Sequence, residues 1–459
     1  MPLHFTKVVS RIIFAIGVMN FDYWGLSSSA DAEDVKPPDT GVIKSIVPAA
    51  LAQLGVQFNA TYIGEFLVNV SGGAKRGAVY DGRLDLGIDV DLEKAIGWTG
   101  AKFHANMFQI HGQGISRDYI GNLMLASNIE ALPATRLYEL WIEQSLMNDQ
   151  ISIRLGQQAA DVEFFDSKYD DMFINSTFGW PAIVGINLPS GGPSPPLAVP
   201  GIRVKAQLSD RITAFAAIFD GNAAGTGPDN PQIRNPDGLA FRVNDPPLIL
   251  GQLKFDFDVG DKGRELPASI YAGGWYHAGP FNDQRFTAQD ISLADPHGSG
   301  VPGQLRSNHG LFIVYEQLLS RATAGSDNGV GFFARASVSP SDRNLINLYV
   351  DGGLQFSGVT PSRPNDKFGI ALAYARIADA AQQLDRDVQY FTNTPVPVRD
   401  HEAVFEITYQ AEVKPGWMVQ PVLQYIAHPA GGSVDPNDPS HIKRIRDAAV
   451  FGLRTTVKF

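Results

Sequence analysis

The chain has 459 residues, 37 Lys and Arg against 48 Asp and Glu, a formal net charge of −11 and no cysteine. An apolar fraction of 44% with 19% charged residues excludes wholesale disorder. The acidic balance argues against nucleic acid as a partner, because phosphate neutralisation needs clustered Lys and Arg. The absence of cysteine excludes thiol nucleophiles, cysteine-ligated zinc and disulfides.

Residues 1–32 have the layout of a secretory signal peptide. A positively charged start is followed by an apolar stretch over 12–19 and the small-x-small cleavage site Ala30-Asp31-Ala32. The alternative is a short N-terminal helix or anchor, because polar residues interrupt the apolar stretch. We expect residues 33–55 to form a periplasmic segment with a short helix over 44–54. No later stretch reaches the ~18 apolar residues of a transmembrane helix.

The remaining chain alternates between apolar and polar residues, which is typical of strands with two unlike faces. In residues 80–92 the even positions are apolar or Gly, and the odd positions are charged apart from one Gly. Many such segments approach the ~9–11 residues that a tilted strand needs to cross a bilayer. About sixteen segments fit the pattern: 56–70, 80–92, 100–112, 135–145, 150–158, 201–208, 211–220, 248–259, 266–277, 309–318, 328–338, 343–356, 366–378, 401–413, 416–428 and 448–459.

The connectors between these segments mostly alternate between short and long. This pattern predicts an all-β fold over 56–459, a transmembrane antiparallel β-barrel of about sixteen strands with short periplasmic turns and long extracellular loops. The link between 338 and 343 departs from the rule, being short where a long loop is due. The long connectors are 159–200, 221–247, 278–308, 379–400 and 429–447.

A soluble secreted β-sandwich or β-helix would produce the same alternation, with the apolar face in the core. Two features favour the barrel. Aromatic residues stand towards strand ends, as in the interfacial girdles of barrels, and the chain ends on Phe459. That terminal Phe resembles the signal read by outer-membrane assembly machinery, which would be a partner.

Ten short stretches carry a resemblance to a known family: Arg136 to Trp141, Leu155-Gly156-Gln157-Gln158, Ala160-Asp161, Glu163-Phe164, Phe173 to Ser176, Phe178 to Pro181, Leu197 to Gly201, Gly273 to His277, Pro340 to Asn344 and Phe451 to Thr455. In these stretches the chain resembles the carbohydrate-selective porins of the OprB family. The resemblance implies a sixteen-stranded outer-membrane channel that passes sugars into the periplasm and needs no cofactor.

The sequence contains no convincing catalytic or metal motif. A barrel enzyme would need a Ser/His/acid set on the outer wall or rim. Ser116 with His111 is a candidate, but a chain of this length offers such pairs by chance. His104 and His111 lie in one strand at opposite parity, so they face opposite sides and cannot share a metal. Asp89 and Asp91 share a face, where a calcium site and a solvated pore wall are the alternatives.

The longest connector, 159–200, is the candidate constriction loop. A sugar offers hydroxyl groups, so a sugar channel should present charged donors and acceptors together with aromatic faces. We expect this loop to fold inward and narrow the lumen; the alternative is an external loop whose aromatics pack on the loop itself. Its candidate substrate-binding residues are Asp161, Glu163, Asn175 and Trp180.

Strand parity assigns further lumen candidates on the wall. If Tyr138, Leu140 and Ile142 face lipid, the residues between them face the lumen. A lumen with both cations and anions suits an uncharged polar solute. Trp141 and Trp180 are candidate stacking platforms, although Trp141 packing beneath the loop is an equal alternative. The wall candidates are Arg83, Asp85, Glu139, Trp141, Glu143, Arg154 and Gln158.

The predicted function is passive, selective diffusion of monosaccharides or small oligosaccharides across the outer membrane. The partners would be sugars and outer-membrane lipids, and the protein would be a monomer or a homotrimer. The alternatives are a general diffusion porin for ions and small solutes, a barrel enzyme and a secreted lectin-like β protein.

Overall fold

The computed structural model describes residues 49–261, 265–323, 326, 328–358 and 360–459. The predicted signal peptide and most of the segment after it lie outside the described residues. A short helix, α3 (Ala49–Gln53), lies where the sequence analysis expected one. No helix among the described residues is long and apolar enough to cross a membrane.

Sixteen antiparallel strands form one closed barrel, which confirms the predicted fold class. Each strand pairs with its neighbours in the chain, and β1 also pairs with β16, so that the sheet has no free edge. The strands are β1 (Val56–Gly73), β2 (Gly77–Asp91), β3 (Ala101–Gly112), β4 (Ala134–Leu146), β5 (Ile151–Gln158), β6 (Val199–Ser209), β7 (Ile212–Phe219), β8 (Leu248–Val259), β9 (Leu266–Thr287), β10 (Pro302–Arg321), β11 (Gly329–Val338), β12 (Ile346–Ser357), β13 (Lys367–Ile377), β14 (His401–Lys414), β15 (Trp417–Ala427) and β16 (Arg446–Lys458).

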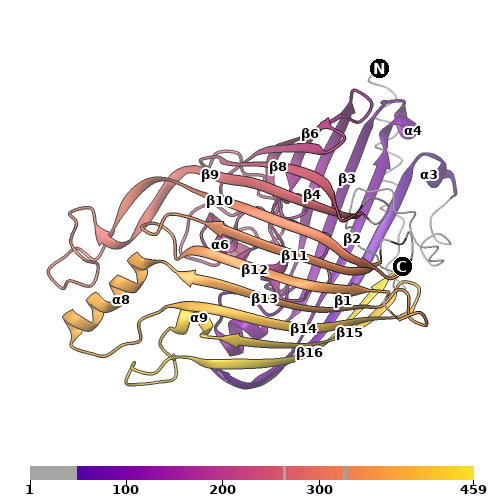
Figure 1. Ribbon diagram of the computed structural model, residues 1–459. Coiled ribbons are helices and arrows are strands. Elements are labelled where there is room, and N and C mark those ends of the chain that lie inside the picture. Colours follow the sequence, from indigo (N-terminus) through magenta and orange to yellow (C-terminus); the bar gives the residue numbers. More distant parts are fainter. Residues whose placement is uncertain (1–48, 262–264, 324–325, 327, 359) are drawn as a thin grey trace.

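In the part of the chain that the structure describes, helices occur only in the connections between strands and before β1. The longest, α8, lies at the end of the barrel that carries the long loops (Figure 1). The others are short: α4 (Leu92–Ile96), the π-helix η1 (Ser116–Ile120), α5 (Ser176–Gly179), α6 (Ala182–Gly185), the 3-10 helix η2 (Pro189–Gly191), α7 (Pro231–Arg234) and α9 (Pro429–Gly432), while α8 spans Asp379–Thr392.

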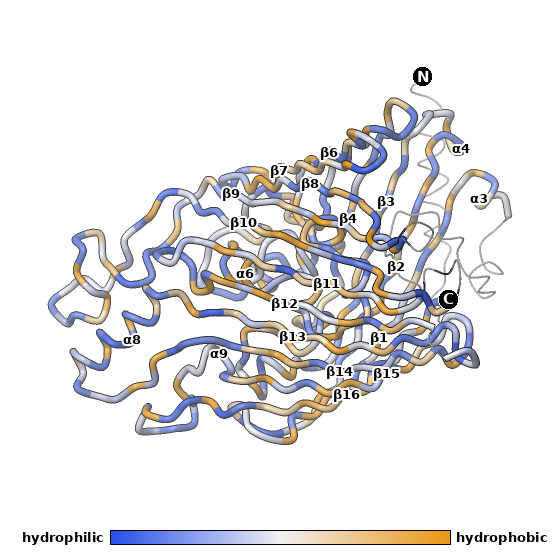
Figure 2. Tube along the Cα trace, viewed as in Figure 1, coloured by the Kyte–Doolittle hydropathy of each residue, from blue (hydrophilic) through white to orange (hydrophobic). Residues whose placement is uncertain are grey.

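The two faces of the wall are reversed relative to those of a soluble protein. Large apolar side chains face outward, and Leu155, Leu311 and Leu372 are 60%, 65% and 59% exposed. Glu65 and Glu406, by contrast, are fully buried on the inner face. Figure 2 shows the resulting alternation of hydropathy along the strands. A β-sandwich would bury the apolar face, so this distribution excludes the soluble alternative and fits a lipid-facing barrel.

Short turns and long loops lie at opposite ends of the barrel. The tight turn 415–416 is at the end where the chain terminates, and the loop with α8 is at the other (Figure 1). The connection between β11 and β12 is short, as the sequence indicated, because it consists only of residues 339–345. The β12 strand starts at Ile346 rather than at 343, so the predicted boundary was also wrong there.

Strands β9 and β10 extend well beyond their predicted ends at 277 and 309. The additional parts still pair with each other, as Gln304 with Asn282 shows. They project from the loop end of the barrel (Figure 1). A strand that projects beyond the membrane needs no apolar lipid-facing residues, so the alternation of apolar and polar residues does not reveal it.

The expected outward orientation of Tyr138 is wrong. The pairing of β3 with β4 shifts register between Ala105 and Met107. A bulge of this kind adds an unpaired residue and reverses the parity beyond it. Tyr138 is consequently 5% exposed and lies on the same inner side as Glu139, whereas Ile142, below the bulge, faces outward as predicted.

Candidate channel lumen

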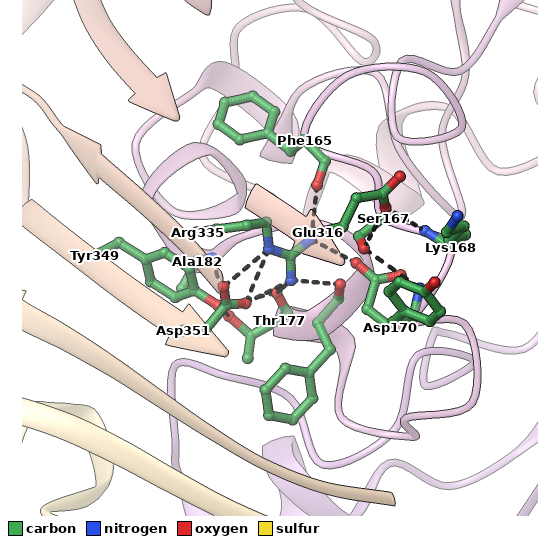
Figure 3. Close-up of polar contacts among 12 residues, drawn as sticks. Phe165, Ser167, Lys168, Asp170, Thr177, Ala182, Glu316, Arg335, Tyr349 and Asp351 are labelled. Carbon is green, nitrogen blue, oxygen red and sulfur yellow. Dashed lines mark hydrogen bonds and ion pairs between the residues drawn. The ribbon is translucent and has the colours of Figure 1, made fainter. Parts of the chain in front are cut away.

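The connection between β5 and β6, residues 159–198 and here called the long inner loop, is bound to the inner wall by Arg335 of β11. Arg335 Nε donates to Asp351 Oδ1 of β12 at 2.9 Å, within a buried ion pair. The guanidinium thus joins two wall strands to the loop (Figure 3). Its loop partners are the carbonyl oxygens of Phe165 and Phe178, at 2.8 and 2.5 Å, and Asp170 Oδ2, at 2.9 Å.

Two buried glutamates of the wall hold further points of the long inner loop. Glu316 of β10 accepts a hydrogen bond from the Ser167 hydroxyl at 2.7 Å. Glu406 of β14 accepts from the backbone N–H groups of Ile174 and Asn175 at 2.7 and 2.8 Å. Hydrogen bonds to charged acceptors contribute about 1.5–3 kcal/mol each, so these carboxylates hold the loop against the inner face of the barrel.

A second inner loop, residues 113–133, packs beside the first, and the sequence analysis assigned no role to it. Glu402 of β14 accepts from the N–H groups of Leu123 and Met124 at 2.8 and 2.7 Å. Backbone hydrogen bonds of 2.8 and 2.9 Å join this loop to the long inner loop. The two loops therefore form one connected body against the β14 side of the wall.

Four of the predicted lumen residues meet in one cluster on the opposite wall. Arg154 Nη2 lies 2.9 Å from Glu143 Oε2 and 3.7 Å from Glu163 Oε1 of the long inner loop. Arg203 of β6 completes the cluster, with Nη2 2.7 Å from Glu143 Oε2 and Nε 2.6 Å from Glu163 Oε2. Two cations and two anions thus alternate, and the cluster carries no net formal charge.

Trp141, the fourth predicted member, lies against this cluster. Its ring has the Arg154 guanidinium 4.0 Å from the centroid and the His104 ring stacked at 4.9 Å. His104 Nδ1 in turn lies 2.7 Å from Asp89 Oδ1. The indole therefore has protein neighbours of its own, as the packing alternative predicted.

A second group lies on β2, β3 and β4. The Arg83 guanidinium is 4.5 Å from the centroid of Phe108, and the Phe108 and Tyr138 rings stack at 4.3 Å. Arg136 pairs with Phe108 in the ladder and is 1% exposed. No hydrogen-bond partner occurs among the described residues for Arg83 Nε, the Tyr138 hydroxyl or any guanidinium nitrogen of Arg136. Stacked aromatics and unpaired donors are therefore brought together here.

The predicted acids of this region have different partners. Asp85 accepts from Asn106 Nδ2 at 3.1 Å, and Glu139 Oε1 accepts from the Ala159 N–H at 2.8 Å. Burial, and next the negative charge of Glu139, raise the pKa of the loop residue Asp161 to about 7. Asp161 therefore changes charge near neutral pH.

The structure places the other three candidates in structural contacts. Gln158 Nε2 donates to the Gly201 carbonyl oxygen at 2.9 Å. Asn175 caps α5 by accepting from the Thr177 N–H at 3.1 Å. Trp180 is 8% exposed, donates from Nε1 to the Gly191 carbonyl oxygen at 2.9 Å and packs within the loop. Trp180 therefore lacks the open ring face that a stacking platform needs.

The calcium and enzyme alternatives find no support in the placement of their residues. Asp89 faces His104, whereas Asp91 caps α4, so the two carboxylates have separate protein partners. The Ser116 hydroxyl accepts from a backbone N–H inside the second inner loop. His111 instead contacts a tyrosine of β1 on the outer face, opposite to His104, as parity predicted.

Comparison with known proteins agrees with this architecture. The family described as carbohydrate-selective porin, OprB family, matches residues 75–459. Porin B of Pseudomonas aeruginosa is 25% identical over 96% of both chains. A protein of Acinetobacter baylyi named putative porin QuiX is 22% identical over 89% of this chain and 90% of its own.

The fold is also that of a solved structure. The high-pH structure of Pseudomonas putida OprB has a TM-score of 0.76 at 21% identity, over 90% of this chain and 96% of that one. These matches confirm a channel, rather than an enzyme, in the bacterial outer membrane. The chain belongs to the OprB family of carbohydrate-selective porins.

Proposed function

We propose that this porin carries out passive diffusion of monosaccharides or small oligosaccharides into the periplasm, and that its two inner loops narrow the lumen. The contacts of Arg335, Glu316, Glu406 and Glu402 support this role, because they hold both loops against one side of the wall. The long inner loop also reaches β5 and β6 through Glu163, so solutes then pass beside it along the wall that β1 to β4 form.

The observation that carries the proposal is the set of unpaired donors beside stacked aromatics on that side. A buried donor without a partner costs about 1–3 kcal/mol, and more when it is charged. The nitrogens of Arg136 and Nε of Arg83 are such donors, so they are available to bind water or the hydroxyl groups of a solute. Phe108 and Tyr138 are 2% and 5% exposed and stack on each other, so they hold these donors in place rather than present an open ring face to the sugar.

The neighbouring cluster of Glu143, Arg154, Arg203 and Glu163 sets the charge of the path. Its two cations and two anions balance, so the cluster favours neither sign of ion strongly. It offers hydrogen-bond donors and acceptors to a neutral solute. We propose Trp141, Asp85, Glu139 and Asp161 as further residues of this lining, and Gln158, Asn175 and Trp180 as residues that shape it through the loop.

Block of ion current by glucose in planar bilayers tests the proposal. Arg136→Met should raise the half-blocking glucose concentration about tenfold, because one charge-assisted hydrogen bond contributes ~1.5–3 kcal/mol. Arg446→Met is the matched control, since Arg446 is an exposed arginine at the start of β16. If glucose does not block the wild-type current, the protein is a general diffusion porin, which is the second candidate.

The assembly partner and the oligomeric state are further proposals. Phe459 directly follows β16, whose pairing with β1 closes the barrel through Lys458 and Thr61. This position supports recognition of Phe459 by the outer-membrane assembly machinery, and deletion of Phe459 should lower the amount of folded barrel in the membrane. Cross-linking in intact membranes distinguishes a monomer from a homotrimer.

A further inference from the structure

Three potential metal ligands meet at the loop end of the barrel, far in sequence from the lumen residues described above. Asp400 precedes β14, His401 is the first residue of β14, and His428 follows β15. One ligand atom from each lies within 4.8 Å of the others. The pairing of β14 with β15, in which Ala403 faces Ala427, brings the two histidines together.

The separations suit a small ion. Asp400 Oδ1 lies 3.2 Å from His401 Nδ1 and 2.8 Å from His428 Nδ1. Ligands at the ~2.0–2.1 Å of zinc in a tetrahedral site are ~3.3 Å apart. An ion could therefore be accommodated by a shift of about half an ångström between Asp400 and His428, together with an approach of the two imidazoles, whose ligand atoms lie within 4.8 Å of each other.

The surroundings hold the three side chains in place. Arg444 Nη1 lies 3.1 Å from Asp400 Oδ2, while Oδ1 faces the two imidazoles and also accepts from the His401 backbone N–H at 2.6 Å. The His401 ring stacks on Tyr374 at 5.1 Å. His428 has the left-handed φ of 50°, and its N–H donates to Asp447 Oδ1 at 2.9 Å. Such a conformation persists in a non-glycine residue only where its neighbours fix it.

We propose that Asp400, His401 and His428 bind one divalent transition-metal ion, with zinc as the reference ion. Two imidazoles and one carboxylate form a ligand set that zinc uses, with a fourth position open to water. A single carboxylate beside an arginine does not suit calcium or magnesium, which need six or more oxygen ligands. The three side chains are 38%, 30% and 33% exposed, so an ion can enter from outside.

The ion would join two extracellular loops. Asp400 ends the loop that contains α8, and His428 begins the loop 428–445. Their existing backbone link is the hydrogen bond from the Asp400 N–H to the Gly431 carbonyl oxygen at 2.9 Å. Bound metal adds a second link between the same loops and should slow their proteolysis.

Titration of the detergent-purified protein with Zn²⁺, using a purification tag without histidine, tests the site. We expect one equivalent to bind, and His401→Ala and His428→Ala each to weaken binding by more than the ~10–100-fold that loss of an outer-shell partner costs. Co²⁺ in place of Zn²⁺ should give the visible absorption of a site with imidazole ligands, and each variant should lose it.

The matched control is His297→Ala. His297 is highly exposed and lies 3.2 Å from Asp295, but these two residues belong to no group of three ligands among the described residues. This variant should bind Zn²⁺ as the wild type does. Absence of one-equivalent binding in the wild type, or equal binding by His401→Ala and His428→Ala shown to be folded barrels, would overturn the assignment.

Discussion

Replacement of Arg335 by Met should release the long inner loop while leaving the barrel closed. Met keeps much of the volume but leaves the buried carboxylates of Asp351 and Asp170 without their cation. Breaking a buried ion pair by removal of one partner costs about 3–5 kcal/mol. The carbonyl oxygens of Phe165 and Phe178 lose their donor in the same step.

A destabilisation of this size raises the population of the released loop by roughly two to four orders of magnitude. Single-channel recordings should then show higher conductance with frequent fluctuations, and glucose block should weaken. Arg376→Met is the control, because its pair with Asp379 is exposed on both sides and such pairs contribute only ~0–1 kcal/mol. Unchanged conductance and glucose block in folded Arg335→Met would refute the view that this loop narrows the lumen.

Three other changes separate the roles of lumen residues. Arg154→Ala removes one of the two cations facing Glu143, and should raise the permeability of cations relative to glucose in liposomes; an unchanged ratio would contradict its place on the solute path. Trp180→Ala should destabilise the loop by about 3–5 kcal/mol, the usual cost of removing a buried aromatic side chain, so limited proteolysis should cut the loop faster while the barrel stays resistant. Because the pKa of Asp161 is raised to about 7, its carboxylate is neutral below that pH, and the cation-to-anion permeability ratio from reversal potentials should fall as pH decreases through 7. Asp161→Asn should remove this dependence, and a retained dependence would assign it to another group.

The barrel could be predicted because the lipid imposes a strict period on every strand that it surrounds. Residues 248–259 show the effect well, since the predicted and observed bounds of β8 coincide. Prediction of strand bounds and side-chain orientation failed where residues do not face lipid or where the strand is irregular. The extension of β9 beyond His277 carries no apolar face for lipid and packs partly against α8 through Arg285 and Asp387. Tyr138 lies at a bulge that the residue pattern does not mark.

The lumen was predictable only in part, for a related reason. The alternation along a strand predicts which wall residues share the inward face, and it placed Trp141, Glu143 and Arg154 on that face; their contact with one another comes from the structure. The same parity, applied to the predicted strand 201–208, would also have found Arg203. It cannot indicate which wall groups bind an inner loop, because those contacts depend on how the loop folds. Arg335 was missed for this reason.

The cluster of Asp400, His401 and His428 could not be predicted from the sequence either. Two histidines separated by a whole hairpin give no motif spacing, and only the register of β14 with β15 brings them into contact. Sequence reasoning therefore treated them as scattered residues.

The central claim is selective passage of sugars, and swelling of liposomes that contain the refolded protein tests it most directly. The rate with glucose is compared with the rate for an amino acid of similar size, at equal protein content and after the barrel is shown to be inserted. The account predicts faster entry of glucose, with the preference reduced in Arg136→Met and unchanged in Arg446→Met. Equal rates for the two solutes in the wild type would contradict selectivity and leave only a general porin.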